Sequence, residues 1–247
     1  MPRITPFRLA AVCALAVSLT LAFAAGATAK GFSADLRVVG SGGKVLAEKT
    51  VSTADTAVKT SPKAECFGAG TGGSGKSVTL KGNTAMGLLA RASKTTPALS
   101  PLLISDHFDF GIALCGVGSS VVKGKASWYL KINHKSLEVG GDSAKIKPGD
   151  EVLWDLAPSY PYPDELALEA PNAVKAGQSF KVKVLAYDEK GKAKPAAGVK
   201  VTGASAPTDA SGRTTVTLMK PAKLIAQAKG EIPSAREPVC VGGKCPK

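Results

Sequence analysis

A glycine-rich segment matches the sequence pattern of a phosphate-binding loop. Residues 70–77 read Gly-Thr-Gly-Gly-Ser-Gly-Lys-Ser and fit G-x-x-x-x-G-K-S. In such loops backbone N–H groups hold phosphate, provided that a strand precedes the loop and a helix follows it. Here residues 78–80 are Val-Thr-Leu, which favour a strand. We therefore interpret the segment as a flexible glycine-rich loop, and we expect no nucleotide as a partner.

The two histidines, His107 and His134, are the side chains best suited to proton transfer at neutral pH. His107 lies close to Asp106 and Asp109, a combination that suggests a metal site or an acid–base pair. The histidines lack the i, i+4 spacing that places two ligands on one helix face. A surface or turn role is the simpler interpretation, and we assign no metal site and no catalytic residue. A hydrolase based on His107 stays open as an alternative.

Other catalytic patterns are missing from the sequence. No G-x-S-x-G segment marks a nucleophilic serine, and the four cysteines after residue 29 leave no free thiol if they form two disulfides. Asp164 and Glu165 are adjacent, so on an extended chain they point to opposite faces rather than toward one substrate. The sequence thus predicts a protein that is not an enzyme.

Aromatic residues make up 5% of the chain, yet several of them gather between positions 128 and 162. Trp128 and Trp154 are expected in the core of neighbouring strands. Strand alternation places Tyr129 on the opposite face from Trp128, where a ligand is accessible. The candidate ligand-binding residues are Tyr129, Asn133, Tyr160 and Tyr162.

The N-terminus has the features of a secretory signal peptide. Arg3 and Arg8 precede an apolar run at residues 9–25, and Ala27-Thr28-Ala29 fits a signal-peptidase site. We predict a signal peptide at residues 1–29 and a secreted or cell-surface protein. An uncleaved membrane anchor is the alternative.

Four cysteines remain after the predicted signal peptide, an even number in a chain bound for an oxidising space. They allow three connectivities in principle. We favour Cys66–Cys115 and Cys240–Cys245, because each pair then lies within one predicted domain. A zinc site is disfavoured because no C-x-x-C spacing occurs.

The chain carries a formal net charge of +13, and most of the excess lies in residues 166–247. A basic exported domain suits anionic wall polymers or membrane surfaces as partners. Lysines that merely solvate outward strand faces are the alternative. Nucleic acid is not expected, because the basic residues form no stripe interleaved with aromatic side chains.

The sequence pattern of residues 30–157 predicts a small α+β domain with one helix on a sheet. Thr84 suits a helix N-cap, and apolar residues from 85 to 92 repeat at helical spacing. The expected strands are 34–39, 44–51, 77–80, 127–133 and 151–156.

Residues 158–165 form a proline–tyrosine linker, which should be extended because proline fixes φ and removes N–H donors. The segment that follows, residues 166–247, shows short strands at regular intervals, as in an antiparallel β-sandwich. The expected strands are 166–170, 179–187, 198–203, 213–219, 222–228 and one near 234–240.

Three motifs in order resemble the transcobalamin-like C-terminal domain, a β-grasp family of largely unknown function. They are Thr-Ala-Met-Gly-Leu-Leu at 84–89, Ser-Trp-Tyr-Leu-Lys-Ile-Asn at 127–133 and Pro-Gly-Asp-Glu-Val-Leu-Trp at 148–154. The resemblance covers about residues 75–157 and implies kinship with β-grasp domains that bind soluble ligands. The sequence departs from the family at His134, where glycine is usual. Cobalamin is not the expected cofactor, because cobalamin carriers share the site with a large helical domain that this chain lacks.

Residues 198–203 and 208–216 look like bacterial immunoglobulin-like modules, in which an Asp-x-x-Gly turn joins two strands. This similarity implies a spacer or adhesive element. The predicted fold class is therefore α+β then all-β, with a β-grasp-like domain followed by an immunoglobulin-like sandwich.

These patterns favour an exported, non-enzymatic binding protein whose β-grasp domain contacts a small molecule, a glycan or an envelope protein. The alternative is a purely structural secreted adhesion or cell-surface protein without a small-molecule ligand. A saturable, ligand-induced shift in thermal unfolding distinguishes the two.

Overall fold

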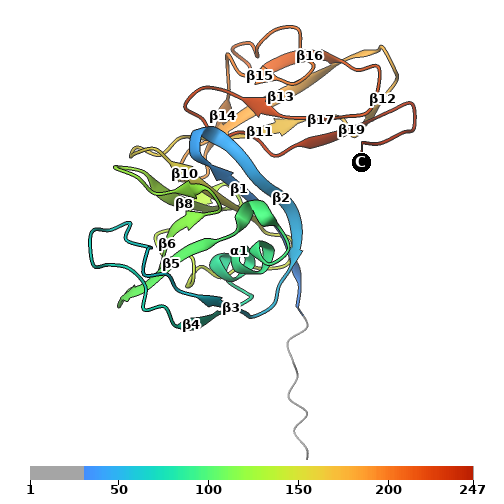
Figure 1. Ribbon diagram of the computed structural model, residues 1–247. Coiled ribbons are helices and arrows are strands. Elements are labelled where there is room, and N and C mark those ends of the chain that lie inside the picture. The colour runs from blue at the N-terminus through green and yellow to red at the C-terminus, as the bar shows by residue number, and fades with distance from the viewer. Residues whose placement is uncertain (1–30, 247) are drawn as a thin grey trace, which may run out of the picture. The chain divides into compact units, whose positions relative to one another are not determined.

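A computed structural model describes residues 31–246, so the predicted signal peptide at residues 1–29 lies outside the described residues. The described chain is rich in β-strands and has one α-helix, α1 (Ala85–Ser93), besides the two short 3-10 turns η1 (Ser41–Gly43) and η2 (Pro97–Leu99) (Figure 1). Among these residues no helix has the length and apolar composition needed to cross a membrane.

The strands before the proline–tyrosine segment are β1 (Ser33–Gly40), β2 (Lys44–Ser52), β3 (Thr56–Lys59), β4 (Ser77–Leu80), β5 (Leu102–Phe108), β6 (Gly111–Val117), β7 (Ser120–Val121), β8 (Ser127–Ile132), β9 (Lys135–Ser136) and β10 (Glu151–Ala157). The later strands are β11 (Glu165–Glu169), β12 (Ala173–Val174), β13 (Ser179–Tyr187), β14 (Ala193–Pro195), β15 (Lys200–Val201), β16 (Arg213–Thr217), β17 (Ala222–Leu224), β18 (Ala226–Gln227) and β19 (Glu237–Val241).

The largest sheet has the strand order β2-β1-β10-β8-β9. β1 and β10 run parallel, and the other neighbours run antiparallel. Because side chains alternate along a strand, the three central strands send one set of residues toward α1 and the other set to the opposite face. The α1 side contains Leu36, Val38, Val152, Trp154 and Leu130, which belong to one buried apolar cluster with the helix.

Helix α1 forms where the sequence predicts it. Thr84 is the N-cap: its hydroxyl accepts a 3.1 Å hydrogen bond from the backbone N–H of Gly87. Leu88 and Leu89 are completely buried against the sheet. Gly87 fits closely there, because an added Cβ would lie 1.9 Å from the backbone oxygen of Lys81.

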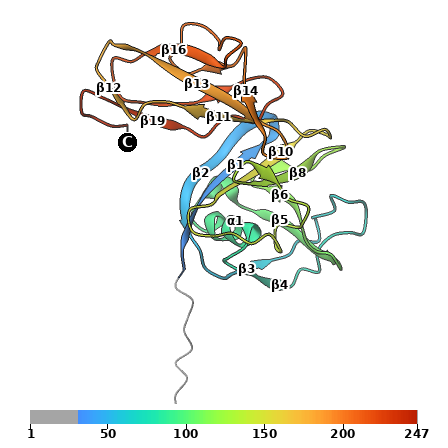
Figure 2. The same ribbon diagram turned by 180° about the vertical axis from the view of Figure 1, so that it is seen from behind.

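The later strands surround a second apolar cluster, which includes Leu166, Val184, Val216 and Leu224. β13 is the central strand of one sheet and pairs with β11, β14 and β16. A second sheet has the order β12-β19-β17, and β15 pairs with β18. Strands β11, β13, β14 and β16 of the first of these sheets can be followed in Figure 2. The strand predicted at 222–228 is split into β17 and β18, and the one predicted at 198–203 shrinks to β15.

Residues 31–247 belong to one compact unit. A third, smaller apolar cluster joins the second face of the main sheet to later residues. It combines Val39, Tyr129 and Leu153 with Ile232, and Tyr162 packs against it. β11 begins at Glu165, the last residue of the predicted linker.

Candidate functional site

A pocket of about 260 Å³ lies beside β8. It is lined mainly by apolar and aromatic side chains with a few polar groups, as is usual for small-ligand sites, although its volume is slightly below their usual range. The residues that matter below are Met86, Trp128, Tyr129, Gly141, Trp154 and Tyr162.

Both tryptophans of the chain line this pocket. The register pairs Trp154 with Leu130 and Leu156 with Trp128, so both indoles lie on the α1 side of neighbouring strands. A glycine is needed next to Trp154, because a Cβ on Gly141 would lie 2.3 Å from the indole ring. The backbone oxygen of Gly141 accepts a 2.8 Å hydrogen bond from Met86, which ties this loop to α1.

Three polar atoms of the pocket residues are buried and have no hydrogen-bond partner within residues 31–246. They are the indole nitrogens of Trp128 and Trp154 and the hydroxyl of Tyr129. Burial raises the pKa of Tyr129 to about 12, so its hydroxyl keeps its proton at neutral pH. A buried donor without a partner costs about 1–3 kcal/mol. Three buried donors without a described partner therefore belong to residues that line the pocket.

Three of the four predicted ligand-binding residues are tyrosines, and the structure separates them into two kinds. Tyr129 is 5% exposed and stacks on Tyr162 with ring centroids 4.1 Å apart, and both line the pocket. Tyr160 is 75% exposed and does not line it, although its ring meets that of Tyr162 edge-on at 5.6 Å.

Asn133 is the fourth predicted residue, and both polar atoms of its side chain form hydrogen bonds that hold a turn. Its Nδ2 donates to Asp150 Oδ1 at 2.9 Å, and its Oδ1 accepts from the backbone N–H of Glu151 at 2.9 Å. Asn133 and His134 have φ values of 50° and 67° and form the two-residue turn between β8 and β9. This left-handed pair is the hairpin geometry that asparagine tolerates well.

The glycine-rich loop at residues 70–77 is followed by strand β4 rather than by a helix. Ser74 donates from both its backbone N–H and its hydroxyl to the carboxylate of Asp106, each at 2.6 Å. These hydrogen bonds hold the pKa of Asp106 below its usual value. The loop therefore presents a carboxylate where a phosphate loop would hold an anion.

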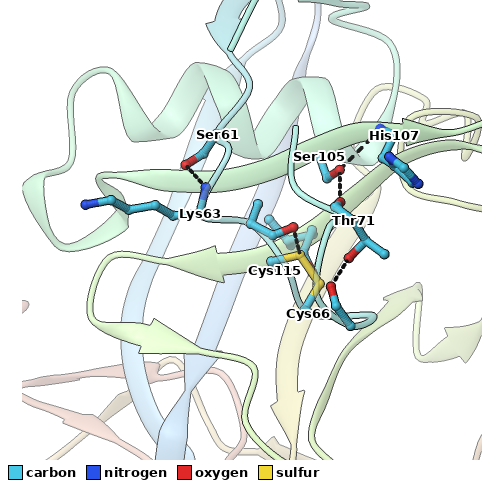
Figure 3. The surroundings of a disulfide bond; sticks show 10 residues. Ser61, Lys63, Cys66, Thr71, Ser105, His107 and Cys115 are labelled. Carbon is cyan, nitrogen blue, oxygen red and sulfur yellow. Dashed lines mark hydrogen bonds between the residues drawn. A yellow bond between two sulfur atoms is a disulfide. The ribbon is translucent and has the colours of Figure 1, made fainter. Parts of the chain in front are cut away.

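Figure 3 shows how this loop is fastened to β5 and β6. Cys66 is joined to Cys115 of β6, and Ser105 of β5 donates a 2.7 Å hydrogen bond to the backbone oxygen of Thr71. The Ser105 hydroxyl also accepts from the backbone N–H of His107 at 3.2 Å. Within residues 31–246 no three His, Cys, Asp or Glu side chains are grouped to hold a metal ion.

The second disulfide joins Cys240 to Cys245, with Cα atoms 4.0 Å apart. Together with Cys66–Cys115, these are the two pairs favoured from the sequence. Two disulfides indicate a chain that folds in an oxidising compartment outside the cytoplasm.

A cluster of buried charges occupies the face of the main sheet opposite α1. Arg37, Lys131 and Asp155 lie there on β1, β8 and β10, and each is at most 7% exposed. Glu165 at the start of β11 is 1% exposed and forms ion pairs with Arg37 and, at 3.4 Å, with Lys131. His134 Nδ1 lies 3.1 Å from the same carboxylate.

The ionisation of this cluster follows from burial and charge. Burial alone would raise the pKa of Glu165, but contact with His134 and the charges of Arg37 and Lys131 together hold it below its usual value. Burial raises the pKa of Asp155 to about 7, against the opposing charge of Arg37. Lys131 also donates a 3.0 Å hydrogen bond to the backbone oxygen of Tyr187. Glu165 therefore joins two basic side chains of the main sheet to the start of β11.

Sequence reasoning placed both tryptophans in the core and left them out of the site. Trp154 is indeed buried, at 3% exposure, but both indoles also line the pocket. The available signal was that the chain has only two tryptophans, both in adjacent strands. The charged cluster was missed as well, although Arg37, Lys131 and Asp155 each interrupt an apolar strand.

Comparison of the chain with protein-family models and with curated proteins finds no match.

Proposed function

We propose that this chain is an exported, non-enzymatic binding protein that holds a ligand in the pocket beside β8. The first part, residues 31–157, is proposed to be a β-grasp-like domain, and residues 166–247 an immunoglobulin-like support. A mixed sheet with one helix on its face supports the first assignment. Antiparallel pairing around β13 and a second sheet support the other assignment.

The observation that carries the proposal is the set of buried donors in the pocket. Trp128, Trp154 and Tyr129 each present a polar atom without a protein partner, on otherwise apolar surfaces. A ligand with an apolar or aromatic body and oxygen acceptors satisfies these donors and fills the pocket. The preferred ligand is therefore a compact neutral or anionic molecule rather than a cation.

The test uses the two tryptophans, because both line the pocket and report on it without labelling. The oxidised protein is titrated with cyanocobalamin, N-acetylglucosamine oligomers, teichoic acid and end-blocked phenylalanine amide. Binding should shift the tryptophan emission and raise the unfolding temperature. A ligand at 100 times its dissociation constant stabilises the protein by about 2.7 kcal/mol.

Two conservative variants separate the pocket from the surface. Tyr129→Phe removes only the buried hydroxyl and should weaken binding about 3- to 10-fold, as expected for one hydrogen bond. Tyr160→Phe removes a hydroxyl from an exposed ring outside the pocket and should change nothing. If no probe changes emission or unfolding, the purely structural secreted protein becomes the better account.

A further inference from the structure

The main sheet has one edge along which part of β8 has no strand partner. β9 pairs only with Lys131 and Ile132 of β8, and no β-bridge within residues 31–246 covers the rest of that edge. Residues 127–130 of β8 pair on their other side with β10. Four consecutive residues therefore have a strand neighbour on one side alone.

The direction of the main-chain groups follows from the ladder. The backbone N–H of Asn133 bonds to Glu151, so residues 131, 129 and 127 also point their main-chain groups toward β10. By alternation, the N–H and C=O groups of Trp128 and Leu130 point to the open edge. Neither residue forms another described backbone hydrogen bond.

The tryptophan pocket lies along this same edge. Its lining includes Ser127, Trp128, Tyr129 and Leu130 in succession. Consecutive side chains of a strand point to opposite faces, so a pocket on one face is lined by every second residue. A pocket that all four residues line is therefore located at the edge of the strand, next to the open main-chain groups.

The opposite edge of the sheet is protected in the usual ways. β2 carries Lys44, Glu48 and Lys49, and a bulge falls between Val38 and Val39 of its neighbour β1. Charges and bulges prevent an edge from pairing with another chain. Residues 127–130 read Ser-Trp-Tyr-Leu and carry no charge. Residues 127–130 thus contain no charged side chain that would block strand addition.

Two basic residues stand at the beginning of this edge. Lys123 and Lys125 are exposed and, within the described residues, take part in no ion pair. They favour an acidic side chain at the corresponding end of a ligand.

We propose that the ligand is an extended peptide segment that adds as a strand to β8. Its main chain pairs with Trp128 and Leu130, an apolar side chain enters the pocket, and an acidic residue lies near Lys123 and Lys125. Main-chain pairing gives affinity in this mode, and the pocket selects the side chain. This inference rests on the proposed binding function and names its ligand class.

The test begins with a positional-scanning library of end-blocked hexapeptides, read by tryptophan emission. The tightest peptide is then remade with one backbone nitrogen methylated at a time. A paired strand predicts alternation: methylation at every second residue lowers affinity at least 10-fold, and methylation between them changes it by less than about 2-fold. Lys125→Glu should weaken binding of acidic peptides several-fold, whereas Lys59→Glu, on β3 and outside the pocket, should not.

The outcomes separate this inference from the proposed function. Equal tolerance of methylation at all positions, or no binding by any peptide mixture while a small probe still binds, overturns strand addition and leaves the pocket function standing. If neither peptides nor small probes change the tryptophan emission, both proposals fail.

Discussion

The two faces of the main sheet are buried through different kinds of interaction, apolar packing on one face and ion pairs on the other. Toward α1 the strands present Leu36, Trp154 and Leu130, which pack against a helix through apolar contacts. Away from α1 the same strands present the buried side chains of Arg37, Asp155 and Lys131, and the two basic ones pair with Glu165. Apolar contacts are indifferent to pH, whereas buried ion pairs depend on every partner being present and correctly charged.

This difference shows what each face contributes. Burying charge gains little over an apolar replacement, so we expect the apolar face to supply more of the stability than the charged face. The charged face ties residues on β1 and β8 to one carboxylate far along the chain. Replacing residues on each face therefore distinguishes general packing from a specific junction.

The largest effect is expected for Glu165→Ala. The change leaves Arg37 and Lys131 buried without their shared anion, and breaking a buried pair costs about 3–5 kcal/mol. Urea unfolding at pH 5.5, where Asp155 is still largely protonated, gives the loss directly. Glu169→Ala is the control, because its 3.8 Å pair with Lys183 is exposed and should change stability by less than about 1 kcal/mol. Similar losses in both variants would contradict the junction.

The next effect is a pH dependence caused by Asp155. Its pKa is about 7 in the folded protein and near the ordinary aspartate value of 3.8 when unfolded, so the folded state holds the proton more tightly. Stability should therefore fall as pH rises from about 4 to about 7. Asp155→Asn removes this slope, and relative to pH 4 it should gain up to about 4 kcal/mol over the unchanged protein at pH 8. Parallel unfolding curves for the two proteins across this range would contradict the assignment.

A smaller effect, without pH dependence, is expected on the apolar face. Leu88 is completely buried on α1, and Leu88→Ala should cost about 3 kcal/mol through lost contacts and a cavity. The loss should be equal at pH 5 and pH 8 in denaturant unfolding. A loss that changed with pH would mean that the two faces are coupled rather than independent.

Local patterns in the sequence were sufficient for several elements. Thr84 and the helical spacing after it predicted α1, and alternation predicted β13 at residues 179–187. The sequence patterns did not predict β5 and β6. Bulges after Leu103 and Ser105 interrupt the pairing of these strands, and residues 113–117 of β6 are all buried. Alternation alone does not identify such strands.

The site was harder to predict because it lies at an edge. Alternation correctly separates Trp128 from Tyr129, but a pocket at the end of the sheet is reached from both faces. The charged cluster depends on Glu165 meeting residues that lie far from it in the chain. No local sequence pattern predicts this long-range contact, so the sequence identified Glu165 only as a neighbour of Asp164.

The charged face has a consequence for the order in which the chain is made. Arg37 and Glu165 are 128 residues apart, and the main sheet is complete once β10 ends at Ala157, before Glu165 is in place. Until Glu165 docks, this face contains a guanidinium, an ammonium and a carboxyl group, which water solvates well. A purely apolar face in the same place would be a surface for aggregation. The charges that later join the two parts of the chain therefore also oppose aggregation of the partly folded protein.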